Sequence, residues 1–345
     1  MLPLALLIIQ LTPETPKVEY RQPQMAVSAK RVAMTFGAGN GVYFSASTDK
    51  GGTFSKPVKV AESGKLSLGR HRGPRVAIAD SAIVISAVTG EKGGGADGDV
   101  IAWRSTDGGK TWSQGVRVND VAGSAREGLH AMSAGAGVLF AAWLDLRGKG
   151  TKLYGAASTN GGATWSKNVL VYESPEGTIC QCCHPSLIVD SKGTIHAMFR
   201  NALGGARDMY VARSADGGQT FGAAEKQGAG TWPLNACPMD GGGLAIAAKG
   251  GVVASWRRDK EIFLAPEGAR ESNLGEGRDP SIAAGGDGIY AAWSSGPGLR
   301  ASVPGGKQPI ELAAVGAFVQ LAGVPDGPVI AAWEANGSIV VRSVR

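Results

Sequence analysis

The sequence predicts an all-β protein, a β-propeller of four-stranded antiparallel blades, and three observations support this fold class. A short turn motif recurs along the chain, strand-like runs follow one another in groups, and 53 of the 345 residues are glycine. The groups repeat with a period of roughly 40 to 50 residues, which is typical of propellers, where no single repeat can bury its faces alone. We therefore expect one propeller domain, although the length alone would accommodate two.

The turn motif has the pattern Ser-x-Asp-x-Gly-x-Thr-Trp, with Phe as the alternative last residue. An Asp or Asn side chain can bond to nearby backbone N–H groups, glycine adopts positive φ, and the last aromatic can fold back onto apolar neighbours. In one copy Asn160 replaces Asp, which an Asx-type turn tolerates. Each copy predicts a tight turn after a strand, and four copies are present, at residues 47–54, 105–112, 158–165 and 214–221.

Alignment on these turns divides the chain into seven units. Seven units favour a propeller of seven blades. Because the last three units are shorter and lack the motif, we keep six blades as the alternative. In six units an aromatic stands at one place in the second strand, and we expect it to pack between blades. These aromatics are Phe36, Trp143, Phe199, Trp256, Trp293 and Trp333. The inner strands are expected to begin near Gln24, Arg75, Leu129, Ser186, Gly242, Ser281 and Val319.

The seventh unit ends at Arg345 on its third strand, so its fourth strand must come from elsewhere in the chain. We predict that an N-terminal strand at residues 17–21 closes the ring, because closure removes exposed strand edges. The predicted propeller domain is therefore residues 17–345.

An apolar run at residues 1–11 precedes this domain. It has the length of a signal-peptide apolar region and is too short to span a bilayer, but no Lys or Arg precedes it and no clear cleavage site follows. We interpret residues 1–16 as an export signal or a disordered lead and expect a periplasmic or secreted protein. A buried N-terminal strand is the alternative. No other stretch is expected to span a membrane.

The overall charge excludes few partners. The net charge of +6 and the pI near 9.1 are mild, and no block of Lys and Arg with interleaved aromatics is present. Nucleic acid is therefore a poor candidate, whereas a small anionic ligand is compatible with this charge. We expect a monomer.

The repeat register predicts which face of the propeller carries the function. The motif turns join third and fourth strands, so they share a face with the turns between first and second strands. The loops that enter the first strands lie on the opposite face, around the central channel. These loops are the longest and least repetitive, which is where a rigid scaffold usually hosts binding or catalysis.

Four copies of the motif resemble the Asp-box, or BNR repeat, of the sialidase-like propellers. The resemblance implies a six-bladed enzyme that binds a sugar carboxylate with three arginines, one in an Arg-x-Pro context. A guanidinium fork suits a planar carboxylate because two N–H groups fit two oxygens. Five arginines near the loop face are candidate ligand-binding residues, the first three in Arg-x-Pro: Arg21, Arg72, Arg278, Arg147 and Arg200.

The same resemblance implies an Asp acid/base and a Tyr nucleophile. Asp97 and Asp99 follow Arg72 and precede a motif turn, which is the order of the family's arginine, acid and box. Three other tyrosines recur at one structural place in the repeat and a fourth lies in a second strand, which leaves Tyr20 and Tyr172; Tyr20 is the candidate nucleophile that we carry forward. No Glu partner for Tyr20 is evident in the sequence.

All four cysteines lie in the entering loops of units four and five. Together with a neighbouring histidine they form a soft ligand set that suits Cu or Zn, and no other cofactor is indicated. A disulfide from one of the first three cysteines to the fourth is the alternative. The run Cys-Gln-Cys-Cys-His-Pro resembles a group of uncharacterised bacterial sialidase-like proteins. The candidate ligands are Cys180, Cys182, Cys183, His184 and Cys237.

These observations predict a propeller that recognises an anionic glycan. Sialidase-type hydrolysis would follow if the acid and the nucleophile are in place, so the sequence leaves open whether the protein is an enzyme. A Cys/His metal-binding or redox propeller is the second interpretation, and a non-catalytic scaffold that binds another protein is the third.

Overall fold

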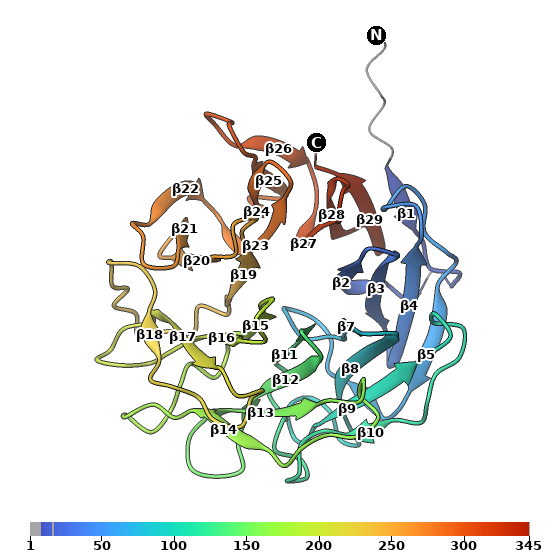
Figure 1. Ribbon diagram of the computed structural model, residues 1–345, viewed down its shortest axis with the longest axis horizontal. Helices are drawn as coiled ribbons and strands as arrows, with labels where there is room; N and C mark the ends of the chain where they lie inside the picture. The colour runs from blue at the N-terminus through green and yellow to red at the C-terminus, as the bar shows by residue number, and fades with distance from the viewer. Residues whose placement is uncertain (1–7, 16, 345) are drawn as a thin grey trace.

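The computed structural model describes residues 8–15 and 17–344. Its strands form seven antiparallel sheets around a central axis, and the ribbon passes from blade to blade in sequence order (Figure 1). Each sheet has four strands in radial order, and one contains an additional short strand. The predicted seven-bladed, all-β propeller is confirmed, and the six-bladed alternative is wrong. No helix that could cross a membrane is found in the described part of the chain.

The first four blades occupy the N-terminal part of the chain. Blade 1 consists of β2 (Arg21–Ser28), β3 (Arg31–Ala38), β4 (Gly41–Ser47) and β5 (Val58–Glu62). Blade 2 consists of β7 (Arg75–Ala79), β8 (Ala82–Gly90), β9 (Asp99–Ser105) and β10 (Val116–Arg117), with β6 (Lys65–Leu66) paired to β8. Blade 3 consists of β11 (His130–Gly135), β12 (Val138–Asp145), β13 (Lys152–Ser158) and β14 (Val169–Tyr172). Blade 4 consists of β15 (Ser186–Val189), β16 (Ile195–Arg200), β17 (Met209–Ser214) and β18 (Glu225–Lys226).

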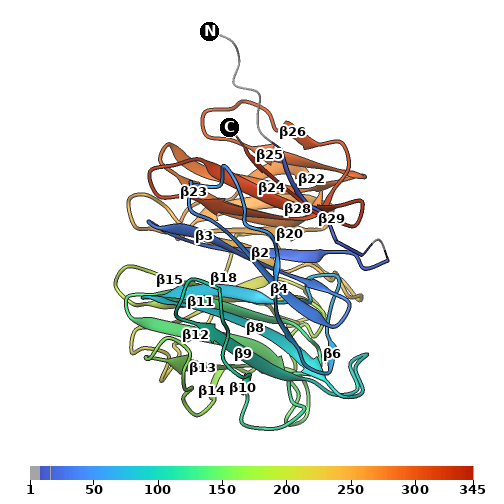
Figure 2. The same cartoon turned by 90° about the vertical axis from the view of Figure 1, so that its right-hand side faces the viewer.

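The last three blades complete the ring. Blade 5 consists of β19 (Gly242–Ile246), β20 (Val252–Arg258), β21 (Glu261–Pro266) and β22 (Ser272–Glu276). Blade 6 consists of β23 (Arg278–Gly285), β24 (Gly288–Ser295), β25 (Gly298–Ser302) and β26 (Ile310–Ala313). Blade 7 consists of β27 (Ala317–Gly323), β28 (Val329–Ala335), β29 (Ser338–Ser343) and β1 (Ile9–Leu11). In side view the strands run across the disc, so the loops fall on two opposite faces (Figure 2).

An N-terminal strand closes the ring, as predicted, but it is not the predicted segment. β1 pairs with β29, with Leu11 opposite Ile339, and the two strands lie side by side in Figure 1. Leu11 is buried in a cluster with Ile339 and Phe36, whereas residues 17–20 form no strand. The apolar side chains of β1 can cover the core at this edge, which residues 17–21 with their exposed Lys17 cannot. The export signal or disordered lead is predicted at residues 1–16. Residues 1–7 and 16 lie outside the described residues, and residues 9–11 of this segment form β1, which agrees with the alternative of an N-terminal strand.

The motif turns fix neighbouring blades to each other. In the clearest copy, Ser105 Oγ donates to Asp107 Oδ1 at 2.8 Å, and the Gly109 N–H donates to Ser105 Oγ at 2.8 Å. These bonds hold the turn. The Thr111 hydroxyl and N–H, followed by the Ser105 hydroxyl, donate to Asp107 and lower its pKa. Gly109 has φ of 95° and packs so closely on Phe44 of blade 1 that a side chain would clash. The motif therefore fixes blade register and lies away from the entering loops.

The predicted second-strand aromatics form the core between blades. Trp143 and Trp293 have no exposed surface, and Phe36, Phe199, Trp256 and Trp333 are also buried. The Trp143 indole donates to Asp145 Oδ2 at 2.7 Å, which satisfies its one polar atom.

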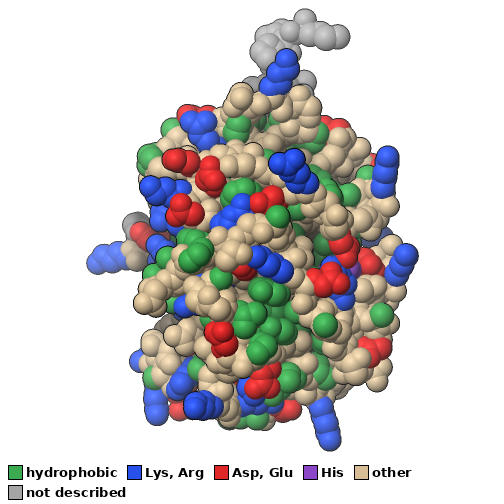
Figure 3. Space-filling view, turned by 90° about the vertical axis from the view of Figure 1, so that its left-hand side faces the viewer, with side chains coloured by type: hydrophobic (Ala, Val, Ile, Leu, Met, Phe, Trp, Pro, Cys, Tyr) green, Lys and Arg blue, Asp and Glu red, His purple; other side chains and the backbone are tan. Residues whose placement is uncertain are grey.

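One side of the disc shows how charge is distributed over the outer surface. Lys and Arg side chains are interspersed there with Asp and Glu (Figure 3). This side therefore lacks the continuous basic surface that nucleic acids require.

Candidate functional site

A short hairpin in the loop before β7 places His71 over the mouth of the central channel. Gly69 and Arg72 exchange backbone hydrogen bonds of 3.1 and 3.0 Å, which leaves Arg70 and His71 at the tip. Both tip residues have positive φ, of 42° and 66°, a conformation that glycine or asparagine usually adopts in such turns. Non-glycine residues there carry backbone strain, which is typical of functional positions. Arg75 holds the tip in place, since its Nη2 donates to the His71 carbonyl at 2.5 Å.

His71 joins loops from opposite parts of the ring. Its Nε2 lies 2.7 Å from Asp279 Oδ1 in blade 6, and both side chains are buried. Its ring stacks on His184 of blade 4 at 4.1 Å and meets Phe318 of blade 7 edge-on at 5.2 Å. The hairpin therefore crosses the channel mouth, above a cavity of about 460 Å³ that the inner strands line.

A second buried carboxylate lies beside this pair. The Asp279 N–H donates to Asp240 Oδ2 at 2.9 Å, while Asp240 Oδ1 has no hydrogen-bond partner among the described residues. Burial, followed by the charge of Asp279, raises the pKa of Asp240 to about 6. Burial acts to raise the pKa of Asp279. The hydrogen bond and the charge of His71 act in the opposite direction and outweigh burial, so the pKa of Asp279 is lowered. His71, Asp240 and Asp279 offer ligand atoms within 4.8 Å of one another.

Two arginines flank the pair on its exposed side. The Arg278 side chain is 53% exposed, and its Nε lies 3.6 Å from Asp279 Oδ2. Arg70 is exposed at the hairpin tip, and its charge also contributes to the lowered pKa of Asp279. Arg21 approaches the base of the same hairpin at Gly69, and its Nε lies 3.4 Å from Glu334 Oε2. The structure thus gathers Arg21 and Arg278 of the predicted set around one mouth and adds Arg70.

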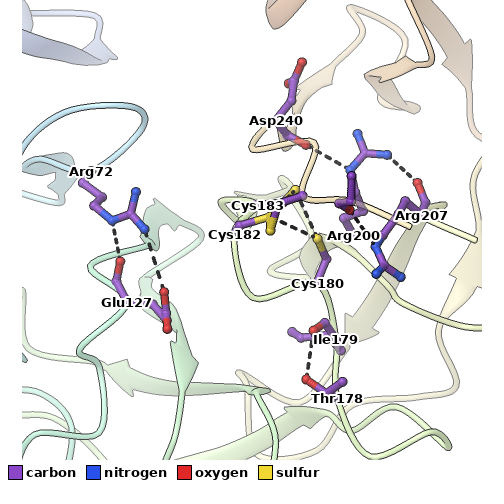
Figure 4. The surroundings of a disulfide bond; sticks show 12 residues. Arg72, Glu127, Thr178, Ile179, Cys180, Cys182, Cys183, Arg200, Arg207 and Asp240 are labelled. Atoms are coloured by element: carbon purple, nitrogen blue, oxygen red, sulfur yellow. Dashed lines mark hydrogen bonds and ion pairs between the residues drawn. A yellow bond between two sulfur atoms is a disulfide. The ribbon is translucent and has the colours of Figure 1, made fainter. Parts of the chain in front are cut away.

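The other three predicted arginines have structural partners. Arg72 turns toward the next blade and donates to the Glu127 carbonyl at 2.7 Å (Figure 4). Arg147 pairs with Asp145 at 2.8 Å and lies over the Tyr154 ring. Arg200 is buried, and its donors are taken by the carbonyls of Asp240, Arg207 and Arg257. Arg72, Arg147 and Arg200 therefore hold neighbouring segments together, and a role for them in ligand binding stays a prediction.

The predicted acid and nucleophile also have local structural contacts. Asp97 accepts hydrogen bonds from the N–H groups of residues 91–93, and these bonds lower its pKa, whereas a general acid needs a raised one. Asp99 Oδ1 accepts from Asn119 Nδ2 and from the Gly123 N–H. Tyr20 is 6% exposed and packs on Phe36, and burial raises its pKa. Because these contacts engage all three side chains, the structure does not support their predicted catalytic roles.

The cysteines form one disulfide and one pair of thiols. Cys182 and Cys237 are bonded and tie the entering loops of blades 4 and 5 together (Figure 4). The alternative prediction, a disulfide between one of the first three cysteines and Cys237, is therefore confirmed. The predicted five-ligand metal set is not assembled, because two of its sulfurs are bonded to each other and His184 stacks on His71 instead. Cys180 and Cys183 remain as buried thiols with their Sγ atoms 3.4 Å apart.

The two thiols differ in their surroundings. The hydrogen bond with Cys183, assisted by the charges of Arg200 and Arg207, lowers the pKa of Cys180 to about 6. Burial raises the pKa of Cys183. The pair is therefore asymmetric, with the thiolate form favoured at Cys180.

The family model described as a BNR repeat-like domain matches residues 40–254. The chain belongs to this BNR repeat-like family. No curated protein matches the chain.

Among solved structures, the α-L-arabinofuranosidase Arb93A from Fusarium graminearum is 13% identical with a TM-score of 0.60, over 98% of this chain and 97% of that one. A streptogramin B lyase is 14% identical with a TM-score of 0.59, over 98% of each chain. The Hadza microbial sialidase Hz136 is 15% identical with a TM-score of 0.56, over 95% of this chain but 66% of that one. Likeness at these identities shows the fold alone.

Sequence reasoning missed the buried centre of this BNR-repeat propeller. His71, Asp240 and Asp279 were visible as members of entering loops, but nothing in the sequence pairs loops of blades 2, 5 and 6. The usable signal was position, because Asp240 and Asp279 stand at or just before an inner strand. In a closed ring these positions converge on the channel mouth.

The buried Asp240 carboxylate should make stability depend on pH. A folded-state pKa raised to about 6 means that the carboxyl contributes stability at low pH, and this contribution is lost as the pH rises through about 6. Asp240→Asn removes the charge and keeps an acceptor for the Asp279 N–H. We expect the variant to be more stable than wild type by about 2–3 kcal/mol near pH 7.5, and nearly equal to it near pH 4, because the loss occurs between the ordinary pKa of 3.8 and the raised one. Urea unfolding at both pH values measures this. A variant less stable than wild type near pH 7.5 would contradict it.

Proposed function

We propose that this BNR-repeat propeller recognises a carboxylate-bearing saccharide at the channel mouth on the face of the entering loops. The observation that carries the proposal is the His71–Asp279 contact, which joins residues 208 positions apart and brings Arg70 to the same mouth as Arg278. Two exposed guanidinium groups beside a buried, rigid pair form a preorganised site for an anion.

The electrostatics of the mouth support an anionic ligand. Arg278 keeps half of its side chain exposed and contacts Asp279 at 3.6 Å, longer than a hydrogen bond, so its donors can turn to a ligand. Asp279 also has a short hydrogen bond to His71, at 2.7 Å. Arg21 can add a third cation from blade 1, since its side chain is 39% exposed beside Glu334.

The saccharide class is supported by the fold neighbours, two of which are named as a sialidase and an α-L-arabinofuranosidase. The proposal covers recognition and not sialidase-type hydrolysis, because Asp97, Asp99 and Tyr20 are engaged in local contacts. A periplasmic or extracellular location is part of the proposal. The Cys182–Cys237 disulfide supports it, since disulfides persist in oxidising compartments.

Calorimetric titration with the methyl α-glycoside of N-acetylneuraminic acid tests the proposal. Arg70→Gln and Arg278→Gln should each weaken binding about tenfold, because each removes a charge-assisted hydrogen bond. Arg117→Gln is the matched control, since Arg117 is exposed on the outer strand of blade 2 and should bind like wild type. Equal losses in all three variants, or none in Arg70→Gln and Arg278→Gln, would refute the proposal.

A further inference from the structure

The two free thiols have the geometry of a redox dithiol. Cys180 and Cys183 are three residues apart, and their Sγ atoms lie 3.4 Å apart without being bonded. This is the Cys-x-x-Cys spacing in which one thiol attacks a substrate disulfide and the other resolves the mixed disulfide. Sulfur atoms in van der Waals contact need only a small movement to form a bond.

A pocket reaches one thiol and not the other. A cavity of about 200 Å³ is lined by Cys180, Gln181, Arg207, Asn235 and Cys237, while Cys183 lies outside this lining. Cys183 is 1% exposed and Cys180 is 4% exposed, so both thiols are buried and only Cys180 borders the pocket. The pocket therefore gives a ligand access to Cys180, and the sulfur nearest to Cys183 Sγ is Cys180 Sγ at 3.4 Å, with Cys182 Sγ at 4.0 Å.

The pocket also indicates the charge of its ligand. Arg207 lines it and bonds only to carbonyls, those of Ala236 at 3.4 Å and Ala206 at 3.5 Å, among the described residues. No carboxylate partner for Arg207 is found in residues 8–15 and 17–344. A guanidinium held by two long contacts is available to an anionic group, and it also favours the Cys180 thiolate.

We propose that Cys180 and Cys183 form a redox-active dithiol that reduces an acidic small-molecule or peptide disulfide bound in this pocket. The Cys180 thiolate attacks one sulfur of the substrate, forms a mixed disulfide and releases the other substrate half as a thiolate. The Cys183 thiol loses its proton and attacks Cys180 Sγ, which releases the second substrate half as a thiol. The dithiol is oxidised to the Cys180–Cys183 disulfide, and the substrate disulfide is reduced by the same two electrons.

The Cys182–Cys237 disulfide has a separate role in this scheme. It ties the loops of blades 4 and 5 together and forms one wall of the pocket through Cys237. Cys182 Sγ lies 3.6 Å from Cys180 Sγ, so internal exchange competes with substrate attack and must be detected in the experiment.

The wild-type protein tests the proposal without any substitution. Oxidised glutathione, an acidic disulfide, is added to the purified chain, and disulfides are mapped by peptide mass spectrometry. The expected products are a Cys180–Cys183 disulfide and two equivalents of released glutathione, with Cys182–Cys237 unchanged. A new Cys180–Cys182 disulfide, unreacted thiols, or thiols that hold a stoichiometric metal ion and do not react would overturn it.

Variants separate the roles of the two sulfurs and of Arg207. Cys183→Ser should trap one glutathione on Cys180, whereas Cys180→Ser should leave Cys183 unmodified. Arg207→Gln should slow the reaction with oxidised glutathione about tenfold and leave the rate with cystamine, a cationic disulfide, unchanged or faster. Equal trapping on both cysteines, or equal slowing with both disulfides, would contradict the proposal. The dithiol pocket differs from the arginine site, so failure of either proposal leaves the other standing.

Discussion

Removing the Cys182–Cys237 disulfide should lower the free energy of unfolding by about 4 kcal/mol. The bond spans 55 residues, and a crosslink over a loop of that length removes this much chain entropy from the unfolded state. The Cys182→Ser/Cys237→Ser variant should therefore unfold at lower urea concentration than wild type under non-reducing conditions. The bond also joins the loops of blades 4 and 5, so the loss should be accompanied by faster proteolysis there.

Two controls make this result specific. Cys180→Ser leaves the disulfide in place and should cost much less, because it replaces one buried thiol with a group of similar size. Reductant should destabilise wild type and leave the double variant unchanged. A double variant as stable as wild type would show that the loops are held by their packing alone.

Asp279→Ala should destabilise the propeller by about 1–3 kcal/mol at neutral pH, because it leaves the buried His71 Nε2 without its hydrogen-bond partner. The residue also has φ of 57°, which Asn tolerates better than Ala, so Asp279→Asn should cost less. Because the folded-state pKa of Asp279 is lowered, the stability contributed by its charge is present above the ordinary pKa of Asp. That contribution is lost as the pH falls through the lowered pKa.

Urea unfolding at neutral and acidic pH measures this effect. The difference between wild type and Asp279→Ala should shrink as the pH is lowered. Glu311→Ala, an exposed carboxylate on β26 of the same blade, is the matched control and should change stability little. A cost that does not change with pH would show that packing, and not the charge of Asp279 beside His71, holds the hairpin over the channel.

The fold could be predicted from the sequence because local signals repeat. The motif turns set the blade register, and aromatics such as Trp143 and Trp293 mark second strands where the motif is absent. The closing strand was harder to place, since a three-residue edge strand pairs through its backbone and leaves little pattern. Burial of Leu11 against Ile339 decides in favour of residues 9–11, and this contact is tertiary.

The sequence predicted which face of the propeller carries the candidate site, but not which side chains form it. The register correctly placed the entering loops around one mouth, and it brought the cysteines of two adjacent loops together. Whether an arginine is free depends on partners far away in the chain, as with Arg21 and Glu334, which are 313 residues apart. The contact between His71 and Asp279 also joins residues far apart in the chain. It depends on ring closure and on a hairpin conformation that no sequence pattern predicts.

The proposed carboxylate site is tested most directly by comparing a charged and an uncharged form of one ligand at the channel mouth. Wild-type protein is titrated with the methyl α-glycoside of N-acetylneuraminic acid and with the methyl ester of the same glycoside. Arg70 and Arg278 should recognise the carboxylate, so the acid should bind at least about tenfold more tightly than the ester, and the difference should disappear in Arg278→Gln. Equal affinity for acid and ester in the wild type, or binding of neither, would contradict it.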